Sequence, residues 1–352
     1  MTISESATRT FAGLGDQLPA VFRMATGFWM SQAVYVAAKL GIADLLAESP
    51  KSCEEIASAT GADSRSLFRL MRALVTLGIL ASEDRQGIVD QWRFSLTETG
   101  ALLQSGMPGS MRSMVLTLGE EHFQAWGKLL HSIQTGKPAF NAIHGRSLFE
   151  YLELNPTAAD VFNAAMSDFT KQAALAAMVA YDFAGISSVA DIGGGQGAFI
   201  RCLLRSNQRI RGLLFDSKGV IESARQLIEA EGLEARCQAI AGNFFESVPR
   251  GNDLYVLKNV LHDWDDESAV AILKTCRRAI DNSGKLLVIE NVLPDCNGVS
   301  FGSLLDLNML VMCGGKERTR AEFHLLFEAS GFRLRRVVDT MAPVSIIEAI
   351  PA

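Results

Sequence analysis

The chain has 352 residues, a formal net charge of −6 and 48% hydrophobic residues. A chain of this length is typical of two domains, and this composition can fill a large hydrophobic core. The acidic balance disfavours a nucleic-acid partner, because proteins that bind nucleic acids usually present a basic face to the phosphates.

Cysteine usage and targeting signals bear on the cellular compartment. No CxxC pair occurs, so neither a zinc knuckle nor a disulfide framework is predicted. The N-terminus, MTISESATRT, lacks the basic start and apolar run of a secretory signal, and no stretch of about eighteen apolar residues follows anywhere. We therefore expect a cytoplasmic protein with reduced thiols and no membrane partner. The six cysteines are Cys53, Cys202, Cys237, Cys276, Cys296 and Cys313.

The first half of the chain carries the signals of helices. Apolar residues recur at helical spacing over residues 30–49, which predicts an amphipathic helix. Ser52 and Glu55 fit a capping box at the start of the next helix. Gly61 is placed to end that helix, and Asp63 can cap the one after it.

A winged-helix pattern follows from the next segments. Residues 87–103 (GIVDQWRFSLTETGALL) contain short extended pieces and then a helix start. Two helices joined by a turn and followed by two short strands are typical of a winged helix. Residues 111–180 are again helical in pattern and rich in Ala, Met and Phe. The first half is therefore predicted to be mostly α-helical.

From about residue 185 strands alternate with helices, which predicts an α/β fold with a doubly wound, mostly parallel sheet. Two final extended runs, residues 332–340 and 343–350, are separated by only a few residues and predict a hairpin. We expect this hairpin to contribute one antiparallel strand at the end of the sheet. The preceding strands are predicted at 187–192, 210–216, 235–242, 253–260 and 284–292, with helices at 219–232, 266–280 and 321–330.

A glycine-rich loop follows the first strand of this half, in VADIGGGQGAF (189–199). Gly193 and Gly195 allow a tight turn and the close approach of a ligand to the backbone. Asp216 closes the second strand, where an acid can bind both hydroxyls of a ribose. The spacing also satisfies the relaxed dinucleotide fingerprint, so NAD stays an alternative. Asp191, directly before the glycines, and the terminal hairpin favour S-adenosylmethionine.

The segment KNVLHDWDDE (258–267) places His262 among acids. Three interpretations compete: a metal ligand, a general base held by carboxylates, and an ordinary residue before a capped helix. The later acids, Asp265, Asp266 and Glu267, fit the first turn of a helix, where negative charge is favoured. They cannot all point at one ion from a helix start, so no metal is predicted.

Three motifs together, DIGGGQG, LKNVLHDWDDE and GGKERT, identify a family. The chain resembles the class I S-adenosylmethionine-dependent O-methyltransferases of small molecules, the branch of plant caffeate and flavonoid enzymes and bacterial polyketide and hydroxyneurosporene methyltransferases. The resemblance implies a Rossmann-like catalytic domain over 185–352, with S-adenosyl-L-methionine as cofactor and S-adenosyl-L-homocysteine as product. It also implies a winged-helix dimerisation domain over 1–110, which forms a homodimer, and a helical linker over 111–184 that contributes to the substrate pocket.

The resemblance implies roles for individual residues. His262 matches the catalytic base, and Glu290 and Glu317 match the acids that flank it. The implied cofactor-binding residues are Asp191, Gly193, Gly195, Asp216 on the ribose, Asn243, Phe244 along the adenine face, Lys258 and Trp264. The implied substrate-binding residues are Phe162, Met166, Met309 and Asp263.

The chain departs from the family at two places in the cofactor site. Asn243, in GNFF, stands where the family usually has an adenine-binding Asp. Asn can still accept a hydrogen bond from the adenine amino group, but it carries no charge. Ser217 and Lys218 replace the usual residues after the ribose-binding acid. These departures put cofactor affinity in question, though not the fold.

The predicted function is methylation of a hydroxyl, most simply a phenol, on an aromatic or polyketide-type acceptor. N-methylation and non-methylating chemistry on the same fold are alternatives, as is an NAD oxidoreductase. A winged-helix DNA-binding regulator is a further alternative, supported by three arginines on one predicted helix. The acidic chain and the complete catalytic half disfavour it. The arginines are Arg65, Arg69 and Arg72.

Overall fold

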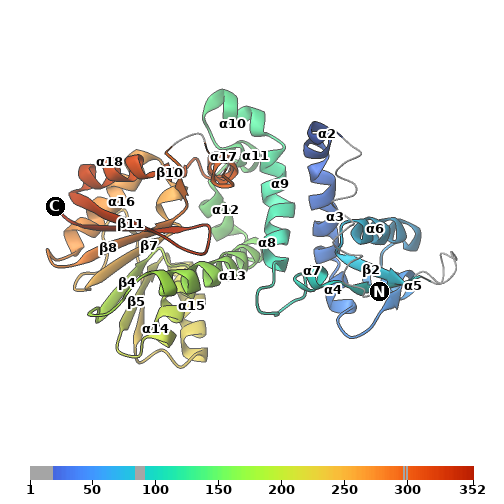
Figure 1. Cartoon of the computed structure of the whole chain (residues 1–352), viewed down its shortest axis with the longest axis horizontal. Coiled ribbons are helices and arrows are strands. Elements are labelled where there is room, and N and C mark those ends of the chain that lie inside the picture. The colour runs from blue at the N-terminus through green and yellow to red at the C-terminus, as the bar shows by residue number, and fades with distance from the viewer. Residues whose placement is uncertain (1–18, 84–91, 296–297, 299) are drawn as a thin grey trace. The chain divides into compact units, whose positions relative to one another are not determined.

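The computed structural model describes residues 19–83, 92–295, 298 and 300–352. By its internal contacts the chain divides into two compact units, an N-terminal unit (Met1–Glu121) and a C-terminal unit (His122–Ala352). Figure 1 shows their elements in chain order from blue to red. The division of the chain into segments at 110 and 184 stays a prediction.

The N-terminal unit is mostly helical and contains the expected winged-helix elements. The capping box of Ser52 and Glu55 is present, and Gly61 ends the helix in the left-handed region with φ 71°. The Asp63 side chain accepts a hydrogen bond from the Ser66 N–H and so caps the second helix. Part of the extended segment expected over 87–103 falls in 84–91, which lies outside the described residues. The elements are α2 (Ala20–Ala25), α3 (Gly27–Lys39), α4 (Ile42–Leu45), β1 (Lys51–Ser52), α5 (Cys53–Thr60), α6 (Ser64–Thr76), β2 (Leu80–Glu83), β3 (Arg93–Leu96), α7 (Glu98–Ala101), α8 (Arg112–Thr117) and the π-helix η2 (Leu118–His122).

The C-terminal unit begins with helices and continues with the strand–helix alternation that the sequence predicts. Its helices are α9 (Phe123–Trp126), α10 (Leu129–Thr135), α11 (Ala139–His144), α12 (Leu148–Leu154), α13 (Pro156–Ala180), α14 (Ala198–Ser206), α15 (Lys218–Ala230), the 3₁₀ turn η3 (Leu261–Asp263), α16 (Asp266–Ala279), α17 (Gly302–Met312) and α18 (Arg320–Ser330). Its strands are β4 (Ser188–Ile192), β5 (Arg211–Asp216), β6 (Cys237–Ala241), β7 (Leu254–Lys258), β8 (Lys285–Glu290), β9 (Val292–Leu293), β10 (Arg318–Thr319), β11 (Phe332–Asp339) and β12 (Ser345–Pro351).

Seven strands form the main sheet, in the order β11-β12-β8-β7-β4-β5-β6. Strands β4 to β8 pair in parallel, and β12 pairs antiparallel with both β8 and β11. The expected hairpin is confirmed, but its antiparallel strand lies one place in from the edge, not at the end. The side chains of the two strands account for this order. Ile346, Ile347 and Ala349 of β12 are apolar and fully buried, which suits a strand with a neighbour on each side. The arginine-rich β11 instead suits a solvent-exposed edge.

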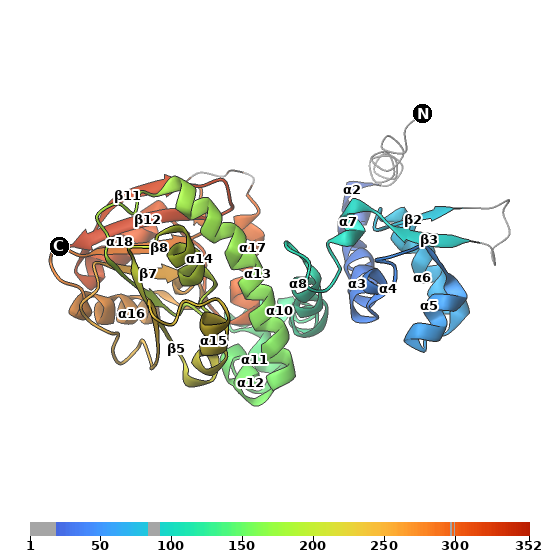
Figure 2. The same ribbon diagram turned by 90° about the horizontal axis from the view of Figure 1, so that it is seen from below.

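Alternating side chains of the parallel strands separate the core into two layers. On β7, Leu254 and Val256 join side chains of α13, α14 and α15, whereas Tyr255 and Leu257 join side chains of α16 and α18. Figures 1 and 2 show these two groups of helices on opposite faces of the sheet. With both faces covered, the carboxyl edge of the parallel strands remains the place where such sheets bind ligands.

Glu348 provides a test of how the terminal hairpin is held. Its side chain is fully buried, and it accepts hydrogen bonds from Arg335 Nη1 at 2.8 Å and Arg336 Nε at 2.7 Å. Glu348→Gln should lower the free energy of unfolding by about 1.5–3 kcal/mol, because charge-assisted hydrogen bonds are lost in a buried place. Arg335→Ala should cost less than about 1 kcal/mol, because that side chain is half exposed and Arg336 remains. Urea denaturation would compare the two variants, and equal losses would contradict this explanation.

Candidate active site

The residues predicted for the site lie at one edge of the main sheet. Strands β6, β5, β4, β7 and β8 are consecutive neighbours and parallel, so their carboxyl ends meet at the same edge. Each of these ends carries at least one predicted site residue. They are Asp191 with the glycine loop after β4, Asp216 on β5, Asn243 and Phe244 after β6, Lys258 on β7 with His262 and Trp264 beyond it, and Glu290 on β8.

The glycine loop presents bare backbone at this edge. Gly193 and Gly195 have φ of 67° and 59°, a region that residues with a Cβ rarely adopt. A Cβ on Gly193 would come within 2.9 Å of Val260 Cγ2, whereas a Cβ on Gly195 would meet nothing within 4 Å. Open space therefore lies over Gly195, where a ligand can approach the main chain closely.

Asp216 is tied to this loop and to the start of α15. Its Oδ2 accepts the Gly195 N–H at 2.8 Å, and its Oδ1 accepts the Ser217 N–H at 2.7 Å. Burial raises the pKa of Asp216, and these two N–H groups oppose the shift. Each carboxylate oxygen has a further lone pair, so the pair can still accept two hydroxyl groups of a ribose.

Asp191 and Lys258 carry opposite charges in this region, and each influences the pKa of the other. Asp191 is fully buried, and among the described residues neither of its oxygens has a hydrogen-bonding partner. Burial raises its pKa to about 7, while Lys258 opposes the shift and Asp216 adds to it. Burial lowers the pKa of Lys258 to about 8, although Asp191 opposes this. A buried carboxylate without a hydrogen-bonding partner, at the edge where such sheets bind ligands, fits the ammonium group of an amino acid.

Aromatic rings gather beside the loop. The Trp264 ring meets those of Phe244 and Phe245 edge to face, with centroids 6.1 and 4.8 Å apart. Phe149 of α12 stacks on Trp264 at 6.0 Å. The family resemblance implied Phe244 and Trp264 but gave no signal for Phe149, which is more than a hundred residues from Trp264 along the chain. A flat ring system such as adenine suits this surface.

Asn243 is held in one orientation by its own loop. Its Oδ1 accepts the Phe245 N–H at 3.0 Å, and its Nδ2 donates to Glu246 Oε1 at 3.1 Å. The carbonyl oxygen keeps one lone pair that could accept from an exocyclic amine. The loss of charge relative to the family's usual Asp therefore does not remove the acceptor.

His262 lies buried on the turn η3, with 7% of its surface exposed. Its Nδ1 lies 2.7 Å from Glu317 Oε1, and its Nε2 lies 3.6 Å from Asp263 Oδ1. Burial lowers the pKa of His262, but the negative charges of Asp263, Glu317 and Glu290 outweigh that effect and raise it to about 9. With Nδ1 bound to a carboxylate, Nε2 is the nitrogen that can take a proton.

Glu290 contacts the backbone of this turn. Its Oε1 accepts hydrogen bonds from the N–H groups of Val260, Leu261 and His262, at 3.0, 2.7 and 3.2 Å. The family resemblance predicts that Glu290 and Glu317 flank the imidazole together. In the structure only Glu317 binds the ring nitrogen, and Glu290 fixes the main chain that carries the ring.

A further acid, Asp306, acts on Glu317 and was missed from the sequence. Asp306 Oδ1, on α17, accepts the backbone N–H of Glu317 at 2.9 Å. Burial raises the pKa of this carboxyl, and the Glu317 N–H opposes the shift. No sequence signal separates Asp306 from an ordinary helix residue, because its partner comes from a different element.

The predicted substrate residues lie on helices that reach this region of the unit. Phe162 packs on a cluster that includes Val311 and Met312 of α17. Met309 is buried on the same helix, and the Cys313 thiol that follows it lies 3.7 Å from Asp263 Oδ1. Met166 is half-buried on α13, next to Ser167, which donates to Gln196 of the glycine loop at 3.2 Å.

The acids after His262 behave as a helix start. Asp266 and Glu267 lie in the first turn of α16, as the sequence predicted, whereas Asp265 precedes that turn and caps the helix by accepting the Ser268 N–H at 2.8 Å. Asp266 pairs with Arg318 and Lys316. Across the described part of the chain, no group of three or more His, Cys, Asp or Glu side chains is arranged to hold a metal ion.

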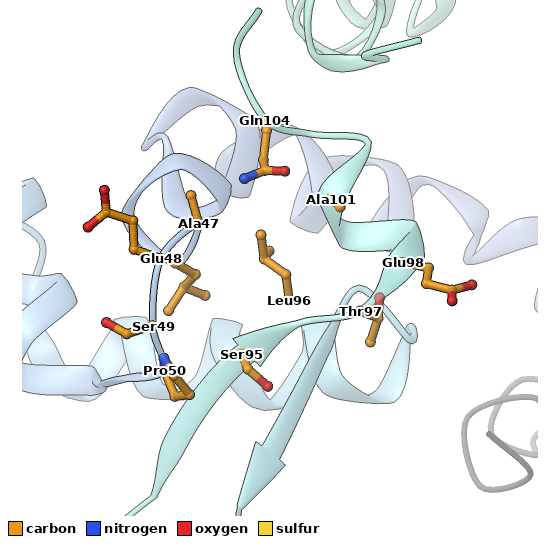
Figure 3. A pocket seen from close by; sticks show the side chains of 11 residues that line it. Ala47, Glu48, Ser49, Pro50, Ser95, Leu96, Thr97, Glu98, Ala101 and Gln104 are labelled. Atoms are coloured by element: carbon orange, nitrogen blue, oxygen red, sulfur yellow. The ribbon is translucent and has the colours of Figure 1, made fainter. Parts of the chain in front are cut away.

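The N-terminal unit has a hollow of a different kind. It lies between the segment that follows α4 and the end of β3, with Leu96, Ala101 and Gln104 around it (Figure 3). Its described lining contains no His, Cys, Lys, Arg or Tyr, so it offers no proton-transfer pair or nucleophile of the kind seen in the C-terminal unit.

In the described ranges, no helix combines the length and the apolar run that a bilayer crossing requires.

Comparison with known proteins decides the family. Residues 126–333 match the model of the O-methyltransferase domain, and residues 22–106 match that of the O-methyltransferase dimerisation domain. The chain belongs to the O-methyltransferase family. The methyltransferase is 46% identical over 331 residues to phenazine O-methyltransferase PhzM of Lysobacter antibioticus, covering 94% of this chain and 95% of that protein.

Two further relatives differ in the atom that their names say is methylated. An O-methyltransferase of neocarzinostatin biosynthesis, solved with S-adenosylmethionine and 2-hydroxy-5-methyl naphthoic acid, matches with a TM-score of 0.80 and 36% identity, covering 92% of this chain and 96% of that one. The 8-amino-8-demethylriboflavin N,N-dimethyltransferase of Streptomyces davaonensis is 36% identical over 304 residues, 85% of each chain. The relatives thus include enzymes named for methylation of oxygen and of nitrogen.

S-adenosylmethionine is the cofactor of this methyltransferase, and the site residues fit it. Asp216 would accept the ribose hydroxyls, and the aromatic surface around Phe244 and Trp264 would hold the adenine. The unpaired oxygens of Asp191 would receive the amino-acid end. When bound, the cofactor supplies an electrophilic methyl group on a sulfonium sulfur.

The pKa of Asp191 makes cofactor affinity depend on pH. A carboxyl with a pKa near 7 is increasingly protonated below that pH and then cannot pair with an ammonium group. Affinity for S-adenosylhomocysteine should therefore fall as pH drops from 7.5 to 5.5, by at most about tenfold per pH unit. Calorimetry would measure it. Asp191→Asn should bind weakly with a flat pH profile, and Asp216→Ala should bind weakly with the slope retained; a steep slope in Asp191→Asn would assign the proton to another group.

Proposed function

We propose that the methyltransferase transfers a methyl group to a phenolic hydroxyl of an aromatic natural product, with His262 as the general base. The observation that carries the proposal is the buried imidazole whose Nδ1 is bound by Glu317 and whose Nε2 is left for an acceptor. The names of the relatives, which include a phenazine O-methyltransferase, support an aromatic acceptor.

The geometry accounts for the protein's part in such a reaction. A neutral phenol is a poor nucleophile, so removal of its proton is the task left to a side chain. Glu317 fixes the tautomer of His262 and stabilises the imidazolium that forms when Nε2 takes the proton. The Asp263 carboxylate, 3.6 Å from Nε2, favours the same charged form. Alignment of two bound substrates would contribute further to the rate.

N-methylation is the second candidate, and the dimethyltransferase relative supports it. A neutral aromatic amine attacks through its lone pair and need not lose a proton first, so it depends less on a base. Mass spectrometry and NMR of the product from acceptors that carry either a hydroxyl or an amine would separate the two activities. Exclusive methylation of nitrogen would replace the proposal.

The role of His262 can be tested by substitution. His262→Ala should lower the rate on a monohydroxyphenazine by about a hundredfold to ten-thousandfold, the usual effect of losing a general base. Affinity for S-adenosylhomocysteine should change little, because the imidazole faces the acceptor. Glu317→Gln should be milder, since an amide can still orient the ring but stabilises its charge less. Near-full activity of His262→Ala would refute the assignment.

The pH profile gives an independent check. A histidine with a pKa of about 9 is protonated at neutral pH, so kcat/KM should rise through the neutral range and level off near pH 9. Glu317→Gln removes a negative charge that raises this pKa, so its profile should level off at a lower pH. With S-adenosylmethionine at saturating concentration, so that the pH dependence of Asp191 does not contribute, His262→Ala should retain only the pH dependence of the acceptor's own ionisation.

We also propose that the methyltransferase forms a homodimer through its N-terminal helices. Residues 22–106 match a dimerisation domain, and large apolar side chains of α2 and α3 are exposed. Exposed apolar clusters of this kind mark protein interfaces. They are Val21, Phe22, Met24, Phe28 and Trp29, between 46% and 79% exposed.

Light scattering would test the assembly. The protein should have about twice the chain mass of 38.1 kDa at micromolar concentration. Trp29→Glu should shift the equilibrium toward monomer, because a charge would be buried in the interface. Met341→Glu, at a residue 94% exposed in the C-terminal unit, serves as the matched control and should remain a dimer. A wild-type monomer would contradict the proposal.

A further inference from the structure

Arg318 is fully buried next to the His262 turn, and its guanidinium is almost wholly engaged. Nη1 donates to the Leu261 carbonyl at 2.8 Å and Nη2 to the Trp264 carbonyl at 2.8 Å. Nε donates to Asp266 Oδ1 at 2.9 Å. One side chain of β10 therefore binds the main chain on both sides of His262 and the first residue of α16.

Glu290 binds the N–H groups of the same turn, whereas Arg318 binds its carbonyl groups. The Glu290 carboxylate accepts the three backbone N–H groups described above. The turn starts at Asn259, whose φ of 51° is the one positive value among the described residues other than glycine. A left-handed residue followed by right-handed ones turns successive N–H groups toward one point, which favours a bound anion. Lys316 adds another link by donating its backbone N–H to the His262 carbonyl at 2.9 Å.

Neither link touches the imidazole, yet both decide where it lies. The ring can meet Glu317 at 2.7 Å only if the backbone of residues 261–264 stays in place. That backbone is a single short turn between β7 and α16, with too few internal hydrogen bonds to define itself. The Arg318 fork matches two carbonyls at once, which a lysine ammonium on a flexible stem cannot reproduce.

We propose that Arg318 is a positioning residue for His262: its guanidinium fixes the turn that carries the imidazole and so keeps the ring on Glu317 with Nε2 toward the acceptor. The proposal rests on the role of His262 in the proposed function. It assigns to the GGKERT motif a second functional side chain beside Glu317, one that acts through the backbone.

Titration of the His262 ring by NMR tests the positioning without any acceptor. The enzyme would carry ¹⁵N-labelled histidine, and His262→Gln would identify the resonance among the five histidines. The charged groups that face the ring or its turn remain unchanged in the variants: Asp263, Lys258, Glu290, Glu317, Asp306, with the Cys313 thiol beside Asp263.

The sign of the shift separates positioning from simple electrostatics. In Arg318→Met a loosened turn weakens the contact with Glu317, so the pKa of His262 should fall from about 9 by about one unit or more. Loss of the arginine's positive charge alone would raise that pKa. An unchanged or raised value in Arg318→Met therefore overturns the proposal.

Two other variants complete the design. Arg318→Lys keeps the charge but cannot hold both carbonyls, so the pKa should fall by a smaller amount; if Arg318→Met does not fold, this variant decides the question, and an unchanged pKa overturns the proposal. Arg236→Met is the matched control, because Arg236 also binds several carbonyls, including those of Leu204 and Ile210, but at the amino end of β6. It should leave the pKa of His262 unchanged.

Kinetics add a readout that a purely structural role would not produce. With a monohydroxyphenazine, Arg318→Met should lose up to about a hundredfold in kcat, as misplacement of a catalytic group by about 1 Å can cause. Calorimetry should show a smaller loss of affinity for S-adenosylhomocysteine, because Trp264 projects from the same turn but is only one of several residues proposed to hold the cofactor. The deficit should shrink at a pH where the phenol itself ionises, because a base is then not needed. A deficit equal at all pH values overturns the proposal.

If no phenol is methylated but the NMR shift occurs, the proposed acceptor fails and the positioning role stands.

Discussion

The carboxylate of Glu290 lies buried at the end of β8, where it accepts three backbone N–H groups of the turn after β7. Burying a carboxylate is costly, and burial raises the pKa of Glu290; these hydrogen bonds, with the nearby charges of His262 and Arg318, offset part of that cost. These hydrogen bonds fix the turn after β7 to the end of the neighbouring strand β8. His262 and Trp264, the side chains proposed to face acceptor and cofactor, both lie on or next to that turn, so their positions depend on this contact together with the links from Arg318 and Lys316.

Charge is distributed over the site in a way that suits a proton acceptor next to a cationic cofactor. Asp263 and Glu317 raise the pKa of His262, and burial raises that of Asp191 to about 7. A site with excess negative charge favours a bound sulfonium and an imidazolium. The departures at Asn243, Ser217 and Lys218 follow β6 and β5, where the adenosine would bind, and not the turn that carries His262. They bear on how tightly the cofactor is held more than on the proton transfer.

Several site contacts join segments that are distant in sequence. Phe149 of α12 stacks on Trp264, Asp306 of α17 binds the backbone at Glu317, and Arg318 binds the carbonyls beside His262. Helices α12 and α17 thus belong to the site as much as the strand ends do.

The sequence by itself determined the features that local patterns control: the capped helices, the strand–helix alternation, the glycine loop and the acid that ends the next strand. Motifs further placed His262 and Glu317 at one site. Tertiary structure alone decided that β12 lies inside the sheet edge, that Glu290 binds backbone instead of the imidazole, and that Arg318 holds the turn. The reason is physical: turn and helix signals act over a few residues, whereas these contacts depend on which strands become neighbours and on which buried polar atoms then remain to be paired.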